Sequence, residues 1–197
     1  EFKSILNEFN NSQENFYQNL DKELRIWLDS KEIFHFSNCF TAISIALRSS
    51  IKNNSSYVAV AALGYRRTLD IIKWSGLQPY ILDNDLDSLA LSLKELRQCI
   101  SKNNIGCILL QHPMVNSVDI EEYLEISKEY QVPLIVDSVE VTGSGAETRK
   151  SASFSAYCES ISLHPSKVLN GAEGGILSFD NQENISNFKR FINDIGI

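Results

Sequence analysis

The sequence predicts a three-layer α/β/α domain in which helices cover both faces of a mostly parallel β-sheet. Short apolar runs of strand length alternate along the chain with longer segments whose apolar residues recur at helical spacing. The short runs are nearly continuous in apolar residues, as is typical of strands covered on both faces. Strands that alternate with helices are the pattern of α/β folds with a parallel sheet.

The first half of the chain contributes two predicted helices and three predicted strands. The helices are expected at residues 12–29 and 41–50, where one face of each helix is apolar. The strands are expected at 57–63 ("YVAVAAL"), 79–83 ("PYILD") and 105–110 ("IGCILL").

The second half repeats this alternation and ends on a helix. A helix is predicted at 119–130, and strands are predicted at 132–137, 156–162 and 174–179. The last helix places four apolar residues on one face, namely Ile185, Phe188, Ile192 and Ile195. No internal repeat or linker divides the 197 residues, so one domain is predicted.

The charge balance argues against nucleic acid and membranes as partners. The chain has 18 Lys and Arg residues against 25 Asp and Glu residues, a net charge of −7, and its basic residues are scattered. No apolar run approaches the roughly 18 residues of a membrane span, and no signal peptide is recognisable. The four cysteines form no C-x-x-C pair, so neither a zinc site nor a disulfide framework is indicated. A cytoplasmic protein is therefore expected.

Polar and aromatic residues follow several of the predicted strands. Asp137 ends one strand, Lys167 lies shortly after another in "SLHPSK", and Tyr65 follows a third. Ligands of open α/β sheets bind at the carboxyl ends of the strands, so these side chains are expected to converge there. An amine, a carboxylate, an aromatic ring and a helix N-terminus are the groups that pyridoxal phosphate needs. Each residue also has a structural interpretation, since a strand-ending Asp is often a cap and a lysine is usually solvated.

Two segments resemble the DegT/DnrJ/StrS family of nucleotide-sugar aminotransferases, which have the aspartate aminotransferase-like fold (type I). "VPLIVDSVEVTG" resembles the family's Asp-x-x-Gln segment, and "SLHPSKVLNGAEGGILSFD" resembles its Ser-Phe-His/Tyr-Pro-Thr/Ser-Lys and Gly-Glu-Gly-Gly segments. "SNCFTAISIAL", "GLQPYILDND" and "LLQHPMVNSVDIEEYLEISKEYQVP" extend the resemblance over nearly the whole chain.

The resemblance implies a role for each of seven residues. Lys167 would form the Schiff base with pyridoxal 5'-phosphate and carry protons, and Asp137 would pair with the pyridinium nitrogen. Tyr65 would stack on the ring. The remaining four would lie close to the cofactor: Ser162, Phe40 and Thr41 near the phosphate, and Glu140 near the phenolate oxygen.

The chain departs from the family's pattern at three of its positions. Cys39 and Phe40 replace a glycine and a threonine of the phosphate turn, which removes a flexible position and a hydroxyl. Glu140 replaces a glutamine, and an ionised glutamate would repel the phenolate unless it held a proton or turned away. The pair Arg66-Arg67 is interpreted as solvated, with a clamp for a nucleotide diphosphate as the alternative. Family members continue beyond the equivalent of Ile197, so residues 1–197 are expected to be a cofactor-binding large domain without the smaller C-terminal domain.

The resemblance implies a homodimeric aminotransferase of polysaccharide biosynthesis. It would transfer an amino group from an amino acid such as glutamate to a keto-sugar carried on a nucleotide. One alternative is a catalytically degenerate homologue that serves as a binding or partner subunit, which the departures at Cys39, Phe40 and Glu140 favour. A second alternative is a sugar dehydratase of the same family, in which a histidine replaces the lysine.

Overall fold

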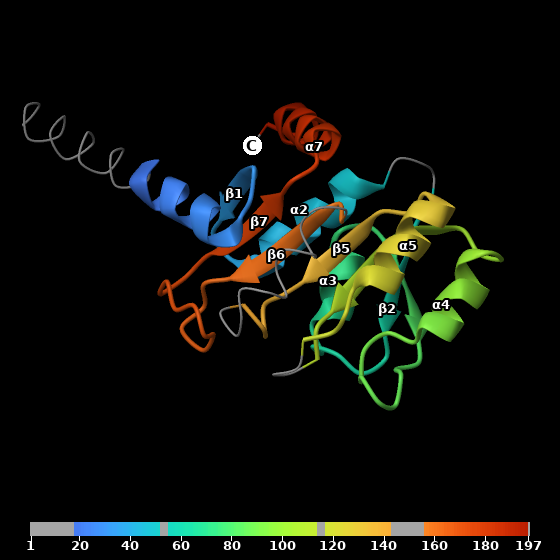
Figure 1. The fold of residues 1–197 in the computed structure, drawn as a ribbon. Coiled ribbons are helices and arrows are strands. Elements are labelled where there is room, and N and C mark those ends of the chain that lie inside the picture. Colours follow the sequence, from blue (N-terminus) through green and yellow to red (C-terminus); the bar gives the residue numbers. More distant parts are fainter. Residues whose placement is uncertain (1–17, 52–54, 114–116, 143–155, 197) are drawn as a thin grey trace, which may run out of the picture.

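The computed structural model describes residues 18–51, 55–113, 117–142 and 156–196. These residues form a seven-stranded sheet in the order β1-β7-β6-β5-β4-β2-β3, with helices on both faces (Figure 1). The strands are β1 (Glu32–Phe36), β2 (Tyr57–Ala61), β3 (Gln78–Leu82), β4 (Ile105–Gln111), β5 (Leu134–Asp137), β6 (Cys158–Ser162) and β7 (Gly175–Phe179). The three-layer architecture predicted from the sequence is confirmed.

The sheet is parallel except at one end. Strands β3, β2, β4, β5 and β6 are parallel to one another, and β7 runs antiparallel to both β6 and β1. The carboxyl ends of the five parallel strands therefore lie along one edge. The turns that follow β4, β5 and β6 therefore lie next to one another at that edge, although they are distant in the sequence, because β5 stands between β4 and β6 in the sheet.

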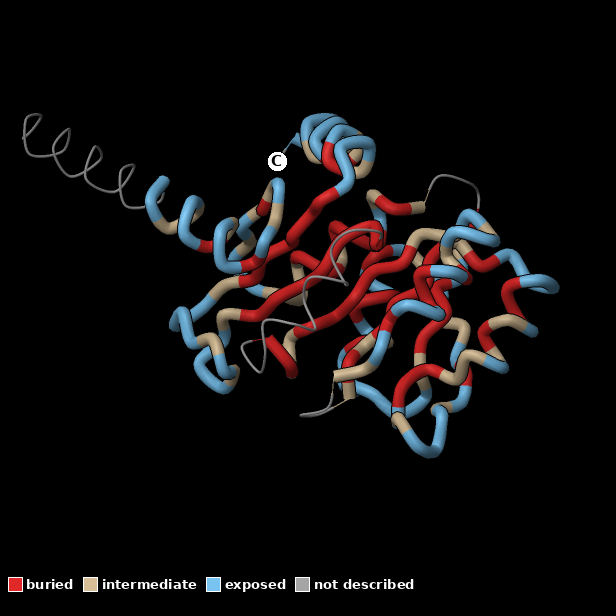
Figure 2. Tube along the Cα trace, viewed as in Figure 1, coloured by how far each residue is buried: buried red, intermediate tan, exposed pale blue. Residues whose placement is uncertain are grey.

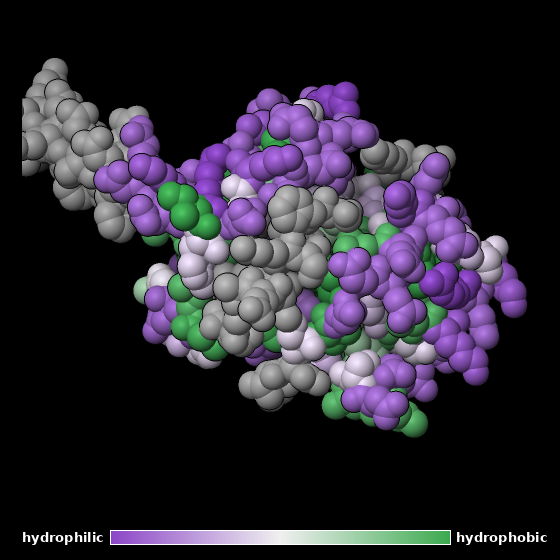
Figure 3. Space-filling model, viewed as in Figure 1, coloured by the Kyte–Doolittle hydropathy of each residue, from purple (hydrophilic) through white to green (hydrophobic). Residues whose placement is uncertain are grey.

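Apolar helix faces cover both sides of the sheet. The helices are α2 (Cys39–Ser50), α3 (Thr68–Trp74), α4 (Leu93–Ile100), α5 (Glu121–Tyr130) and α7 (Gln182–Asp194), preceded by helical residues 18–28. One buried cluster joins α2, α3 and α7 to the sheet, and a second joins α4 and α5 to the opposite face. The strands are buried along the middle of the molecule (Figure 2). The outer surfaces of α4, α5 and α7 are hydrophilic (Figure 3).

Three elements were not predicted from the sequence. Strand β1 contains His35 and begins at Glu32, so it has no continuous apolar run, and its pairing with β7 makes it a strand. Helices α3 and α4 are short, with seven and eight residues, and sequence analysis missed both. Their buried residues, Ile71 and Ile72 in α3 and Leu96, Cys99 and Ile100 in α4, pack against the sheet.

Several predicted boundaries are wrong by a few residues. The strand expected at 57–63 ends at Ala61, and the strands expected to begin at 132 and 156 begin at Leu134 and Cys158. The helix expected at 41–50 begins earlier, at Cys39, because the Asn38 side chain caps it. Of the helix expected at 12–29, residues 12–17 lie outside the described residues. Within the described ranges, no helix has the length and apolarity needed to cross a membrane.

Candidate functional site

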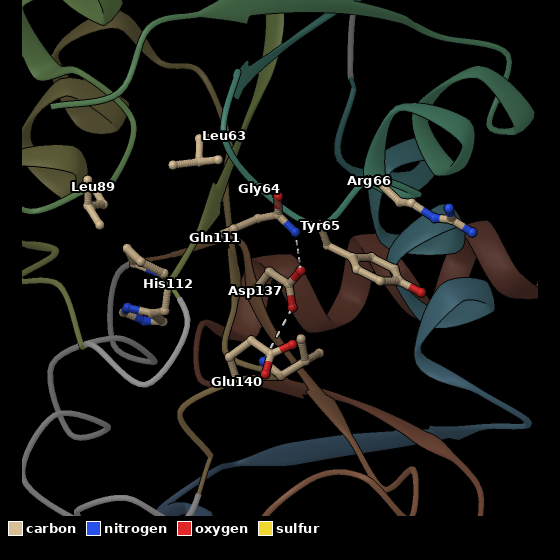
Figure 4. A pocket seen from close by; sticks show the side chains of 11 residues that line it. Leu63, Gly64, Tyr65, Arg66, Leu89, Gln111, His112, Asp137 and Glu140 are labelled. Carbon is tan, nitrogen blue, oxygen red and sulfur yellow. Dashed lines mark hydrogen bonds between the residues drawn. The ribbon is translucent and has the colours of Figure 1, made fainter. Parts of the chain in front are cut away.

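A cavity of about 460 Å³ opens at the carboxyl edge of the sheet (Figure 4). It lies where β2, β4 and β5 end, as expected for a ligand site in an open α/β sheet. Its lining residues are Leu63, Gly64, Tyr65, Arg66, Leu89, Gln111, His112, Pro113, Asp137, Val139 and Glu140. The sequence-predicted residues Asp137, Tyr65 and Glu140 are among them.

Asp137 is the last residue of β5 and is a buried carboxylate facing this cavity. Only 3% of the residue is exposed. Its Oδ2 accepts a hydrogen bond of 2.9 Å from Gln111 Nε2, and its Oδ1 accepts bonds from Ser160 Oγ at 3.1 Å and the Val139 amide at 3.3 Å. Burial raises the pKa of Asp137, the hydrogen bonds oppose that rise, and the charge of Glu140 adds to it. A cation bound beside Asp137 would compensate its desolvation.

Lys167 lies at the end of the turn that follows β6. The Lys167 amide donates to the carbonyl of His164 at 2.9 Å, and the Ser166 amide donates to His164 Nδ1 at 3.2 Å. This His-Pro-Ser corner bends the chain back toward the sheet edge. Lys167 Nζ then donates directly to Glu140 Oε1, and the lysine side chain is 22% exposed. Lys167, which was predicted to be a nucleophile, is not itself among the residues that line the cavity, but it is bound to Glu140, which is.

The thiol of Cys39 is affected by the charges of both Asp137 and Lys167. Burial raises the pKa of the Cys39 thiol well above its usual range; the charge of Asp137 raises it further, whereas the Ser160 hydrogen bond and the charge of Lys167 lower it. Both charges therefore act on one thiol at the start of α2. Gly175 permits this close approach, since a Cβ there would lie 2.5 Å from the Cys39 amide nitrogen.

The three residues predicted near the phosphate are not among the cavity-lining residues. Thr41 donates from both its amide and its hydroxyl to Asn38 Oδ1, at 2.8 and 3.1 Å. The Phe40 ring contacts the Trp74 ring at a centroid distance of 5.0 Å. Ser162 Oγ accepts a bond of 3.2 Å from the His164 amide. Phe40 and Thr41 belong to the first turn of α2 rather than to the turn before it.

The structure separates the two neighbouring arginines. Arg66 lines the cavity, whereas the Arg67 guanidinium lies 5.2 Å from the centroid of the Phe40 ring. Arg66 is thus the arginine that lines the cavity, and Arg67 is not among the lining residues. Tyr65, next to Arg66, also lines the cavity and is 55% exposed (Figure 4).

Gln111 and Val139 are site residues that sequence analysis missed. Gln111 lies one residue beyond the strand predicted at 105–110, and its Nε2 also donates to Thr68 Oγ1 at 2.9 Å. Its Oε1 is buried without a hydrogen-bond partner among the described residues. Val139 is the second residue after β5, so its position shortly after a predicted strand was the available signal.

His112 is a buried neutral residue in the cavity wall. Burial lowers its pKa from 6.5 to about 4, and its Nδ1 accepts a hydrogen bond of 3.1 Å from the Val118 amide. Nδ1 is therefore unprotonated, and in the neutral ring the proton is on Nε2. His112 orients the chain after β4 and can donate to a ligand.

The depressed pKa of His112 predicts acid sensitivity. The unfolded state binds a proton below pH 6.5, and the folded state binds it only near pH 4. The stabilisation is complete above pH 6.5 and is lost as the pH falls to 4, and it amounts to about 3 kcal/mol at about 1.4 kcal/mol per pH unit. His112→Asn keeps an acceptor for the Val118 amide but has no group that titrates in this range. When the pH falls from 7 to 4, its free energy of unfolding, measured in urea, should therefore fall by about 3 kcal/mol less than that of wild type. Equal losses would contradict the assignment.

Comparison with known proteins identifies the family. The model of the DegT/DnrJ/EryC1/StrS aminotransferase family matches residues 1–196. The chain belongs to this family. GDP-perosamine synthase of Caulobacter vibrioides is 23% identical over 168 residues, which are 85% of this chain and 45% of that protein.

Solved structures show the same fold. Helicobacter pylori PseC, an aminotransferase involved in the biosynthesis of pseudoaminic acid, has a TM-score of 0.76 at 19% identity, covering 87% of this chain and 46% of that one. Bacillus subtilis ntda with bound cofactor PMP has a TM-score of 0.76 at 20% identity, covering 89% and 39%. The chain thus spans less than half the length of each of these three proteins.

The chemistry of the site fits the ring of the pyridoxal cofactor implied by the family. A buried carboxylate suits a protonated ring nitrogen, and an amine close to the cavity suits an aldehyde. Tyr65 and Val139 supply an aromatic and an aliphatic wall. The start of α2 fits the phosphate less well, because the Thr41 amide and hydroxyl already bond to Asn38.

Proposed function

We propose that this chain is the cofactor-binding large domain of an aminotransferase that uses pyridoxal 5'-phosphate and acts on a nucleotide-linked keto-sugar. One observation carries the proposal: the buried Asp137 carboxylate lines the cavity, and the amine of Lys167 is bound to Glu140, which lines the same cavity. Membership of an aminotransferase family supports it. An amino acid such as glutamate would be the amino donor.

Several residues in and beside the cavity have distinct roles in this proposal. When bound, the cofactor supplies an electron sink that makes a proton on the carbon attached to the transferred nitrogen removable. Asp137 keeps the ring nitrogen protonated, and Gln111 and Ser160 hold that carboxylate in place. Lys167 binds the aldehyde and carries protons, and Tyr65 covers the ring. Arg66 is the residue of the cavity suited to a phosphate of the sugar nucleotide.

The assembly and location follow the family resemblance. We propose a homodimer in the cytoplasm whose substrates are a nucleotide-sugar and an amino acid. The name of GDP-perosamine synthase supports a nucleotide-sugar as the substrate class.

Covalent capture of the cofactor tests the proposal. The protein mixed with pyridoxal phosphate should develop yellow absorbance, and borohydride should then fix the cofactor to the peptide that contains Lys167. Mass spectrometry of the digest measures both the site and the yield. Absence of any cofactor on that peptide at millimolar concentration would reject the cofactor-binding role.

A degenerate homologue is the second candidate function. The favouring observation concerns the residues expected near the phosphate. Phe40, which replaces a threonine of the family, packs on Trp74, and the neighbouring Thr41 donates a hydrogen bond to Asn38. Such a protein would keep the fold as a binding or partner subunit and would remain colourless in the capture experiment. The dehydratase alternative is disfavoured because lysine, not histidine, occupies position 167.

A further inference from the structure

The ion pair between Lys167 and Glu140 joins two loops at the carboxyl edge of the sheet. Glu140 lies in the turn that follows β5, and Lys167 lies in the turn that follows β6. Twenty-seven positions separate them in sequence, and the parallel pairing of β5 with β6 brings their turns together. The pair is partly shielded from solvent, with side-chain exposures of 22% for the lysine and 32% for the glutamate.

The surrounding groups leave Glu140 as the carboxylate in contact with the amine. Asp137 uses its two oxygens for Gln111, Ser160 and the Val139 amide. The raised pKa of Cys39 keeps its thiol protonated, so it is no acceptor for the lysine proton. Glu140 also lines the cavity itself, so a small aldehyde that reaches Lys167 also reaches Glu140.

We propose that Glu140 is the proton carrier for condensation of Lys167 with an aldehyde. This inference deepens the proposed function and rests on it. Glutamine, which the resemblance places at this position, can donate a hydrogen bond but cannot take up and return a proton at neutral pH. A carboxylate in contact with the reacting nitrogen can do both, which is what general acid–base catalysis requires.

The proton transfers balance in three steps. Glu140 takes one proton from the Lys167 ammonium, which leaves a neutral amine and a carboxylic acid. The amine nitrogen attacks the aldehyde carbon, and one nitrogen proton passes to the former carbonyl oxygen. Glu140 then returns its proton to that hydroxyl, the carbon–oxygen bond breaks, water leaves, and a protonated carbon–nitrogen double bond remains beside the restored carboxylate.

Two reagents that attack the same amine separate this role from simple charge pairing. Acetic anhydride also reacts with the free amine, but its tetrahedral intermediate expels acetate, so no acid is needed to expel water. Formaldehyde with cyanoborohydride methylates the amine only after the adduct of amine and aldehyde has lost water, which is the step that an acid assists. Both rates scale with the free amine. With cyanoborohydride in such excess that the methylation rate no longer depends on its concentration, loss of water limits methylation, and the ratio of methylation to acylation at Lys167 isolates the step that needs an acid.

We expect Glu140→Gln to lower this ratio by on the order of tenfold or more relative to wild type. The two rates are measured at pH 7 by mass spectrometry of the Lys167 peptide, with no pyridoxal cofactor present. Glu173→Gln, an exposed glutamate near the same edge, serves as the matched control and should leave the ratio unchanged. Circular dichroism and the thermal midpoint verify that each variant is folded.

The outcomes distinguish this inference from the proposed function. An unchanged ratio in Glu140→Gln overturns the proton-carrier role, whether both rates rise together or neither changes. A lowered ratio supports the role even if pyridoxal phosphate fails to attach to Lys167. That failure, seen in the capture experiment, would instead reject the proposed cofactor.

Discussion

Lys167→Ala and Lys167→Arg should both abolish the yellow absorbance and the borohydride-fixed cofactor. Alanine removes the amine, and arginine keeps the positive charge but stays protonated and cannot condense with an aldehyde. The comparison therefore separates a chemical role from an electrostatic one. The measurement is the yield of cofactor on the digest peptide that contains residue 167, which should fall from near-stoichiometric to background.

A lysine elsewhere on the surface provides the control for this experiment. Lys128→Arg changes an exposed residue of α5, away from the cavity, and should capture as much cofactor as wild type. If Lys167→Arg retained the absorbance, the lysine would be an anion-binding residue, and another amine would have to carry the cofactor. Lys167→Arg also preserves a cation for Glu140, so loss of capture cannot be attributed to a broken ion pair alone.

Asp137→Asn should weaken cofactor binding about 100-fold or more while leaving the cofactor-free protein at least as stable. A neutral amide cannot compensate the charge of a protonated ring nitrogen, and a close charge pair at an effective dielectric constant near 20 is worth about 4 kcal/mol. Equilibrium titration monitored by absorbance measures the affinity. Unchanged affinity would show that Asp137 is only a structural cap at the end of β5.

The stability of this variant depends on pH in a direction set by the raised pKa of Asp137. Because burial holds the folded-state pKa above 3.8, the folded protein binds more protons than the unfolded chain in the interval between the two values. The stabilisation is complete below pH 3.8 and is lost as the pH rises through the folded-state pKa. Asp137→Asn has no such loss, so its free energy of unfolding relative to wild type should increase from pH 4 to pH 7. Urea unfolding at both pH values measures this difference, and a decrease would contradict the burial of an ionised Asp137.

Local sequence determined the framework and the principal residues of the site. Nearly continuous apolar runs predicted most of the parallel strands, because strands covered on both faces are rich in apolar residues. Asp137 directly after one run and Lys167 in a Pro-containing turn after another were recognisable for the same reason. These features depend on neighbours within a few residues, which the sequence displays.

Only the tertiary structure decided which of these side chains contact one another. Gln111 became the partner of Asp137 because β4 pairs beside β5, and Phe40 turned toward Trp74 because α2 packs against α3. Sequence analysis expected Glu140 near the phenolate oxygen of the cofactor and did not foresee that its carboxylate binds the Lys167 amine. That contact arises because β5 and β6 are neighbours in the sheet, so the turns that follow them lie together although their residues are 27 positions apart. No local sequence pattern encodes the distance between two such turns.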